Sequence, residues 1–159
     1  DTFDTLEEKL NNVGVNVLRN ESVYIYNGGS DKIQLIGVDD PAQVGHSNHI
    51  EDNISRLTQT PEDTKNFQIL LSHRPELLSI YSEYDIDLVF SGHSHGGQFR
   101  IPFIGGLIAP NQGLFPEYDS GEYVVNQTTM IVNRGLGNSV IPFRLFNRPE
   151  IVLVTLEIE

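Results

Sequence analysis

The apolar residues near the start of the chain recur at intervals of three and four positions: Phe3, Leu6, Leu10 and Val13. This spacing places them on one face of a helix, while the charged residues 7–9 lie on the other face. Gly14 follows the last apolar position and can end a helix in a left-handed turn. The pattern therefore predicts an amphipathic helix over residues 2–13.

Short runs of β-branched, aromatic and aliphatic residues predict strands along much of the remaining chain. The runs lie at residues 15–18, 23–26, 32–38, 67–71, 87–90, 123–126, 129–133 and 151–157. The sequence Asn27-Gly28-Gly29-Ser30 separates two of them and is typical of a hairpin connection. A polar stretch over residues 39–66 contains a weaker helical pattern at 50–57. Residues 98–123 are rich in glycine, proline and aromatics and predict a long ordered loop or an irregular hairpin.

The clearest pattern is a strand, a helix and a second strand over residues 67–90. Pro75 stands where a helix reaching residue 84 would have its first turn. This order predicts a βαβ unit with parallel strands. His73 follows the first strand, and His93 and His95 follow the second, so polar residues gather where open α/β sheets place their sites. We predict an α/β fold with a mixed β-sheet and flanking helices.

Composition narrows the classes of function. Twenty-two acidic residues against ten basic ones give a formal charge of −12, which disfavours nucleic acids and anionic membrane surfaces as partners. The chain has no cysteine, so any metal must be held by nitrogen and oxygen ligands. No apolar run approaches the roughly 18 residues of a membrane helix.

The ends of the sequence suggest that it is a piece of a larger product. The chain begins Asp1-Thr2-Phe3, and Met130 is its only methionine. We therefore expect a fragment or a processed protein. A leader or anchor would lie outside this sequence, so the location in the cell stays open.

His93 and His95 stand two apart in a turn flanked by glycines, which lets the backbone fold tightly and present both imidazoles. A lone H-x-H pair is a weak signal. The preceding apolar strand and His73 at the end of the strand before it strengthen the pair into a predicted metal site. A metallo-β-lactamase would continue H-x-H-x-D-H and a cupin would place a glutamate close by, but neither pattern follows His95.

Two segments of this region resemble a known family. Residues 70–76 (LLSHRPE) and 87–98 (DLVFSGHSHGGQ) are similar to the second half of bacterial calcineurin-like metallophosphoesterases. The likeness continues through Asn133-Arg134-Gly135-Leu136-Gly137 to the closing Arg148-Pro149-Glu150-Ile151. The resemblance is closest to an envelope-associated subgroup whose precursors often carry an anchor or export signal. It implies a membrane-associated or cell-envelope location, with a cytoplasmic one as the alternative.

The resemblance implies a fold and a chemistry. The fold is an α/β sandwich of two sheets, with residues 1–159 as the C-terminal part of a single phosphoesterase domain. The chemistry is hydrolysis of a phosphomonoester or phosphodiester by a hydroxide that two divalent ions activate. His73 and His93 would bind one ion and His95 the other. Imidazole ligands suit Mn, Fe, Zn or Ni.

The motifs that the family carries in its first half are D-x-H, G-D-x-x-D and G-N-H-[DE], and none occurs before His73. They supply the remaining metal ligands, the bridging carboxylate and the histidine that protonates the leaving group. We therefore assign no catalytic residue to this chain and expect it to be inactive, or nearly so, by itself. The alternative is a non-catalytic metal-binding or interaction domain that kept the histidines.

Other residues carry weaker signals. Arg134 beside Gly135 could bind a substrate phosphate, or it could be a solvated arginine in a glycine turn. We interpret Asp39-Asp40-Pro41 as a turn that ends a strand rather than a catalytic pair, although the resemblance places it near the rim of the site. We interpret His46 and His49 as surface residues rather than metal ligands. The phenylalanines at 99, 103 and 115 would line a groove, form a membrane-facing lip or pack the loop. A half-sandwich would expose one face of its sheet, which predicts a homo-oligomer through that face.

Overall fold

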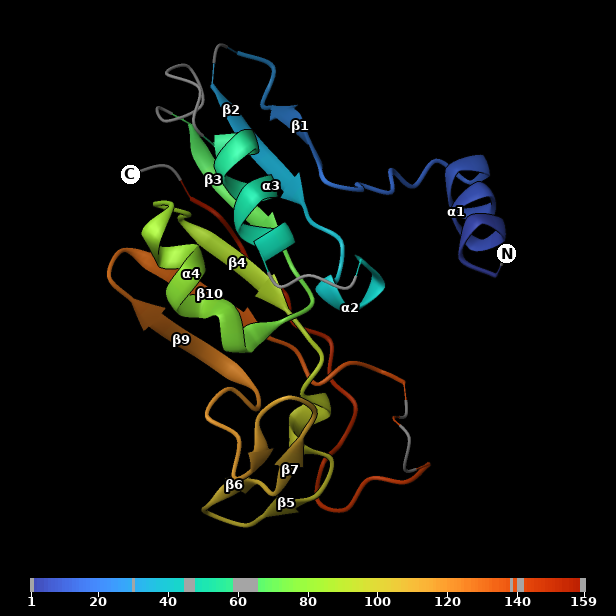
Figure 1. Cartoon of the computed structure of the whole chain (residues 1–159), viewed down its shortest axis with the longest axis vertical. Coiled ribbons are helices and arrows are strands. Elements are labelled where there is room, and N and C mark those ends of the chain that lie inside the picture. The colour runs from blue at the N-terminus through green and yellow to red at the C-terminus, as the bar shows by residue number, and fades with distance from the viewer. Residues whose placement is uncertain are drawn as a thin grey trace.

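A six-stranded mixed sheet forms the middle of the computed structural model, which describes residues 2–29, 31–44, 48–58, 66–137, 139 and 142–157 (Figure 1). The strands lie in the order β1 (Glu21–Tyr26), β2 (Lys32–Gly37), β3 (Phe67–Leu71), β4 (Leu88–Ser91), β10 (Thr128–Val132) and β9 (Gly121–Val125). The four inner strands are parallel to one another, and β1 and β9 pair antiparallel at the edges. The predicted α/β fold with a mixed sheet is confirmed.

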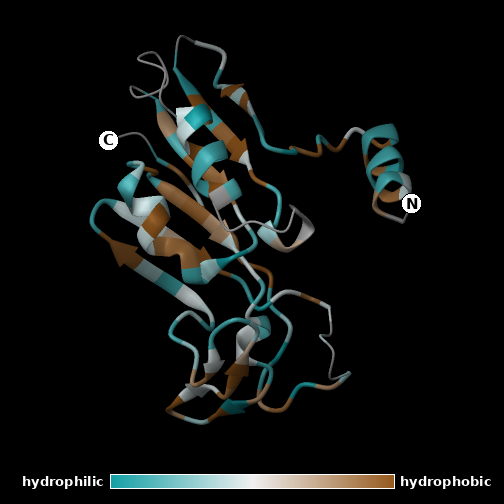
Figure 2. Ribbon diagram, in the orientation of Figure 1, coloured by the Kyte–Doolittle hydropathy of each residue, from teal (hydrophilic) through white to brown (hydrophobic). Residues whose placement is uncertain are grey.

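Helices cover one face of this sheet. They are α3 (Asn48–Thr58) and α4 (Leu78–Glu83), and the 3-10 turn η2 (Pro75–Leu77) leads into α4. Strand residues on that face, such as Ile36 and Leu70, are fully buried against helix residues such as Ile54. Successive strand side chains point to opposite faces, so Leu71 remains 39% exposed although Leu70 is 0% exposed. Figure 2 shows hydrophobic residues along the strands of this sheet.

The helices agree with the sequence prediction. The first helix, α1 (Thr2–Asn12), ends as expected because Gly14 has a φ of 84° and its N–H bonds to the Asn11 carbonyl at 3.0 Å. It lies apart from the sheet (Figure 1). The helix predicted at 50–57 is α3, and a further short helix, α2 (Pro41–Val44), follows β2. None of the helices within the described ranges is long and apolar enough to cross a membrane.

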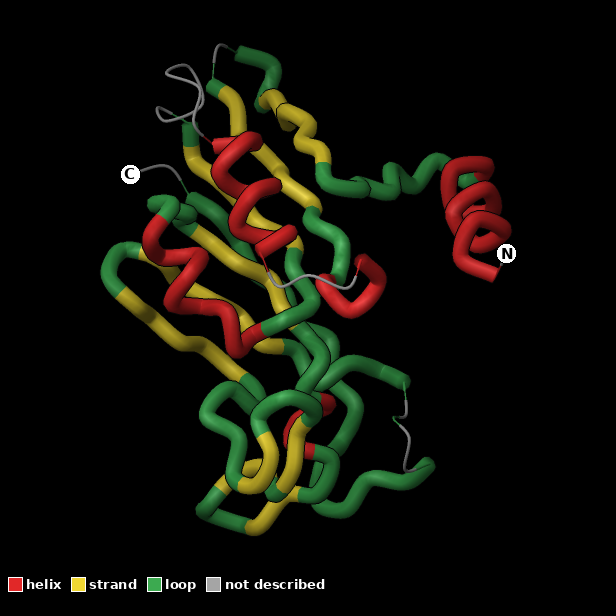
Figure 3. The backbone as a smooth tube through the Cα atoms, in the orientation of Figure 1, coloured by secondary structure: helices red, strands yellow, loops and turns green. Residues whose placement is uncertain are grey.

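Two strand predictions were wrong. Residues 15–18 and 151–157 form no strand, and both are drawn as loop in Figure 3. A strand is stable only when a neighbour accepts and donates its backbone hydrogen bonds, and neither segment pairs with a strand in the described part of the chain. Apolar composition alone could not reveal that missing partner.

Residues 98–123 form the predicted irregular structure as two small hairpins. The first pairs β5 (Arg100–Ile101) with β6 (Gly105–Gly106), and the second pairs β7 (Ile108–Ala109) with β8 (Gly113–Leu114). The 3-10 turn η3 (His95–Gly97) connects the sheet to these hairpins. They lie beyond the carboxyl end of β4 (Figure 1).

Candidate metal centre

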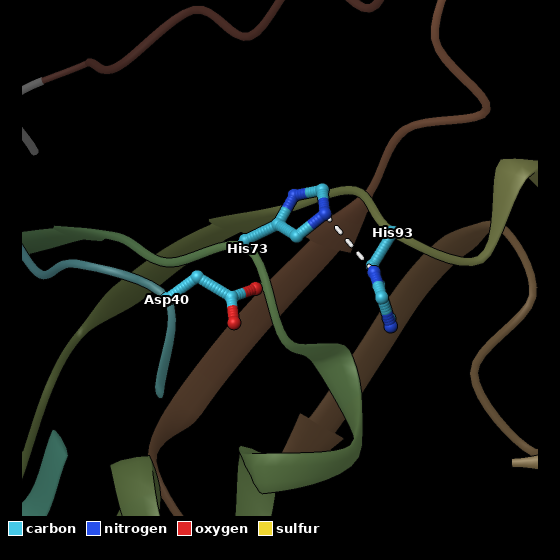
Figure 4. A group of neighbouring side chains, drawn as sticks. All are labelled: Asp40, His73 and His93. Carbon is cyan, nitrogen blue, oxygen red and sulfur yellow. Dashed lines mark hydrogen bonds between the residues drawn. The ribbon is translucent and has the colours of Figure 1, made fainter. Parts of the chain in front are cut away.

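His73 and His93 come together at one edge of the sheet. Each stands two residues beyond a parallel strand, His73 after β3 and His93 after β4, and the last paired residues of the two strands are Leu71 and Phe90. His73 Nε2 lies 3.0 Å from His93 Nδ1, and the rings meet edge to face (Figure 4). The structure thus brings these two predicted ligands together, and their binding of a metal ion stays a prediction.

Asp40 joins this pair from a third strand. It follows β2, which is parallel to β3, so its carboxylate reaches the same sheet edge. One ligand atom from each of Asp40, His73 and His93 lies within 4.8 Å of the other two. Sequence reasoning favoured a turn over a catalytic role for Asp40, although the resemblance placed the segment near the rim of the site. The signal that could have found it is its place after a parallel strand, where the carboxyl ends meet.

The Asp40 carboxylate is held by Arg74. The guanidinium donates from Nε at 2.9 Å and from Nη2 at 2.8 Å, one bond to each carboxylate oxygen. Burial raises the pKa of Asp40, but the bonds from Arg74 and from the Ala42 N–H outweigh it and hold the pKa below its usual value. Asp40 is thus ionised, and much of its charge is compensated by Arg74.

The two ring nitrogens fit a metal ion. Because nitrogen ligands bind transition metals at about 2.0–2.1 Å, two of them on one ion lie about 3 Å apart or more, and the observed separation is 3.0 Å. Partial burial of the ring, followed by the electrostatic effect of the neighbouring His93, lowers the pKa of His73. A lowered pKa favours the neutral imidazole, which is the form that binds metal.

His95 is not part of the cluster of Asp40, His73 and His93. Burial, followed by the charge of Arg144 and the electrostatic effect of His93, lowers the pKa of His95. Its assignment to a second ion stays a prediction. His49 also lies outside the cluster, with its Nε2 3.0 Å from Asn53 Nδ2, and His46 lies outside the described residues.

The backbone that carries His93 and His95 has an unusual conformation. The φ angles of His93, His95, Gly96, Gly97 and Gln98 are all positive, between 48° and 72°. A Cβ on Gly96 would overlap Asn147 Oδ1, and a Cβ on Gly97 would overlap the backbone of Gly106. These glycines are therefore required by close contacts as well as by backbone conformation.

Asn147 holds this turn in place. Its side chain is 3% exposed, and its Nδ2 donates to the His95 carbonyl at 2.6 Å and to the Gln98 carbonyl at 3.1 Å. It thus spans both ends of the left-handed segment from a position about 50 residues further along the chain. No sequence pattern pointed to this residue, because its role depends on a tertiary contact.

Tyr81 holds the loop that carries His73. The buried hydroxyl donates to the Arg74 carbonyl at 2.6 Å, so it accepts the bond from Ser72 Oγ at 2.7 Å. Ser91 Oγ also donates to the Ser72 carbonyl at 2.8 Å and links the ends of β3 and β4. These bonds fix the backbone on both sides of His73.

Arg134 reaches the same neighbourhood from β10. This strand is parallel to β4, and the Asn133 N–H bonds to the Ser91 carbonyl at 2.9 Å. The Arg134 Cγ lies 3.0 Å from the position that a Cβ on Gly96 would take. The side chain predicted to bind phosphate is therefore next to the turn of His95, and its role stays a prediction.

Comparisons with known proteins agree with this geometry. The chain is 35% identical over 144 residues to the uncharacterised metallophosphoesterase YkuE of Bacillus subtilis, a match that covers 91% of the chain and 47% of the relative. It is 28% identical over 151 residues to the phosphodiesterase YaeI of Escherichia coli, covering 94% and 50%. A zebrafish relative named transmembrane protein with metallophosphoesterase domain is 31% identical over 161 residues, covering 94% and 34%.

No protein-family model matches the chain, and no solved structure matches it significantly. The chain spans about half the length of the curated relatives YkuE and YaeI that it matches. Nearly the whole chain takes part in these alignments, and the names of YkuE and the zebrafish relative both contain the word metallophosphoesterase. The chain is therefore similar, over about nine tenths of its length, to roughly half of a protein named metallophosphoesterase.

Proposed function

We propose that the chain is the C-terminal part of one phosphoesterase domain, and that the complete protein hydrolyses a phosphomonoester or phosphodiester with two divalent ions. The observation that carries this proposal is the pair of ring nitrogens, His73 Nε2 and His93 Nδ1, 3.0 Å apart at the carboxyl edge of parallel strands. That edge is where α/β sheets bind ligands.

The residues have distinct roles in this proposal. His73 and His93 hold one ion, and His95 contributes to the second. When bound, the ions neutralise phosphate charge and make a water molecule more acidic. Arg74 fixes the Asp40 carboxylate beside the histidines, in the way that hydrogen-bonded neighbours orient metal ligands. A membrane-associated or cell-envelope location remains the expectation from the resemblance.

We further propose that the 159-residue chain is inactive, or nearly so, without the other part of the domain. A dinuclear centre needs carboxylates that bridge and complete its coordination. Both oxygens of Asp40, the acidic member of the cluster, are already bound by Arg74. The sequence before His73 has none of the family's other ligand motifs.

The first test is calorimetric titration of the chelator-treated chain with Mn²⁺ or Zn²⁺. Loss of a neutral imidazole ligand in His73→Ala or His93→Ala should weaken binding by about tenfold or more. His49→Ala is the matched control, and its affinity should equal that of the unmodified chain. Equal affinity in all three variants would contradict the metal site.

The second test is hydrolysis of bis-p-nitrophenyl phosphate and of p-nitrophenyl phosphate. The complete protein should turn over one of them only with metal, whereas the 159-residue chain should not. Metal-dependent turnover by the chain alone would refute its inactivity. Metal binding by the complete protein without hydrolysis of any phosphate ester would establish the non-catalytic alternative instead.

A further inference from the structure

One arginine, Arg134, lies next to the turn that carries His95, and a second, Arg144, is hydrogen-bonded to the backbone of the first. The Arg134 Cγ lies 3.0 Å from the position that a Cβ on Gly96 would take. Arg144 is half-buried, and its Nη2 donates to the Arg134 carbonyl at 3.0 Å and to the Gly137 carbonyl. One side of the Arg144 guanidinium is thus fastened to the loop that follows β10.

Each of these arginines keeps a donor that lacks an acceptor. Arg134 Nε and Arg144 Nη1 are buried and have no hydrogen-bond partner within the described residues. The carboxylate of Glu150 lies 3.7 Å from Arg134 Nε, which is an ion pair rather than a hydrogen bond. A buried donor without an acceptor is costly, so such atoms indicate a missing partner.

Arg144 also differs from Arg74 and Arg100 in whether its charge is paired with a carboxylate. Arg74 is paired with Asp40 at 2.8 Å, and Arg100 with Asp119 at 3.0 Å. Arg144 makes no ion pair with any described residue of the chain, although the chain carries a formal charge of −12. A cation without an ion-pair partner among the described residues therefore lies at the Arg134 backbone, and its charge contributes to the lowered pKa of His95.

We propose that Arg144, together with Arg134, binds the phosphoryl group of the substrate on the His95 side of the site. This inference rests on the proposed function, since it assigns the cationic partners of the same phosphate. A phosphate offers several strong acceptors, and a guanidinium matches two of them in one plane. The bonds to the Arg134 and Gly137 carbonyls hold Arg144 in position before the anion arrives, which reduces the entropy lost on binding.

The experiment titrates the metal-free chain with inorganic phosphate at constant ionic strength, following the arginine Nε–H signals by NMR. Loss of a charge-assisted hydrogen bond in Arg144→Gln should raise the dissociation constant about tenfold or more. Arg144→Lys retains the charge and a donor for the carbonyls, so it should show an intermediate loss. Arg148→Gln removes the same charge from an exposed position on the same segment and should leave the constant within about twofold.

Circular dichroism selects the folded variants, and Arg144→Lys serves if Arg144→Gln does not fold. Phosphate affinity within twofold of the unmodified chain in a folded Arg144 variant overturns the proposal. An equal loss in Arg148→Gln also overturns it, because the effect would then come from net charge. Metal titration of the same variants separates the two ideas: Arg144→Gln should bind Mn²⁺ as the unmodified chain does, whereas His73→Ala should not.

Discussion

The two segments that carry the histidines differ in how their backbones are held. The loop of His73 joins β3 to the turn η2, continues an ordinary strand-to-helix connection, and is fixed by the nearby Tyr81 hydroxyl. The segment from His93 to Gln98 has five positive φ angles and depends on contacts with Asn147 and Gly106. The backbone at His73 thus needs only a nearby hydroxyl to hold it. The turn of His93 and His95 is strained, and contacts from residues outside the turn hold it in place.

The largest effect should come from Gly97→Ala. The new Cβ would overlap the backbone of Gly106, and the residue has a φ of 72°, so we expect a loss of about 2–4 kcal/mol in the free energy of unfolding. Urea denaturation of the metal-free chain measures this loss.

Gly92→Ala is the matched substitution at the other end of the motif. The nearest atom to its new Cβ is His73 Nδ1 at 3.9 Å, an ordinary contact, and Gly92 is outside the left-handed region. We expect a change within about 0.5 kcal/mol. Similar losses at the two glycines would show that the turn is no more constrained than the strand end.

Tyr81→Phe tests the loop of His73 and should have a smaller effect than Gly97→Ala. The substitution removes the hydroxyl that bonds to the Arg74 carbonyl and to Ser72 and leaves the ring in place. Because a buried carbonyl then loses its donor, the free energy of unfolding should fall by about 1–3 kcal/mol. Tyr84→Phe on the same segment is the control, and its value should stay close to that of the unmodified chain. Equal stability of Tyr81→Phe would mean that the hydroxyl does not hold this loop.

The smallest effect concerns pH. The pKa values of His73 and His95 in the folded chain lie below the ordinary value of 6.5. Below pH 6.5 the unfolded chain therefore binds more protons than the folded one, and folding becomes less favourable. Stability of the metal-free chain should be level above about pH 7 and decline as the pH falls below about 6.5.

Urea midpoints between pH 5 and pH 8 measure this dependence. Replacing His73 or His95 with asparagine should make the decline shallower, and the exposed position of His73 makes its share modest. If stability falls with pH just as steeply when both His73 and His95 are replaced, other groups cause the loss of stability in acid.

Much of the fold could be predicted because it follows from local patterns. The apolar run at 67–71 coincides with β3, and Pro75 begins the helical segment that ends at Glu83. Residues 15–18 and 151–157 have the same apolar character but form no strand. Strand formation requires a hydrogen-bonding neighbour, and residue patterns do not say whether that neighbour exists.

Part of the candidate site could also be predicted from local patterns. The sequence placed His73 and His93 after parallel strands, so their meeting followed from topology. Asp40 was assigned to a turn because a turn and a site-facing carboxylate have the same local sequence, and its bond to Arg74 spans 34 positions. Asn147 and Arg144 were missed because their contacts with the His95 turn and the Arg134 carbonyl join distant segments.

The sequence by itself determined that this is an α/β chain with histidines at the ends of neighbouring strands. The hydrophobic pattern of a short segment is enough to predict each strand and helix, and their order predicts parallel strands. Only the tertiary structure decided which carboxylate joins the histidines, why Gly96 and Gly97 are needed, and which buried arginine donors lack an acceptor among the described residues. Those properties depend on atoms that come together only after the chain has folded, when burial and close contact make an unpaired donor or an added methyl group costly.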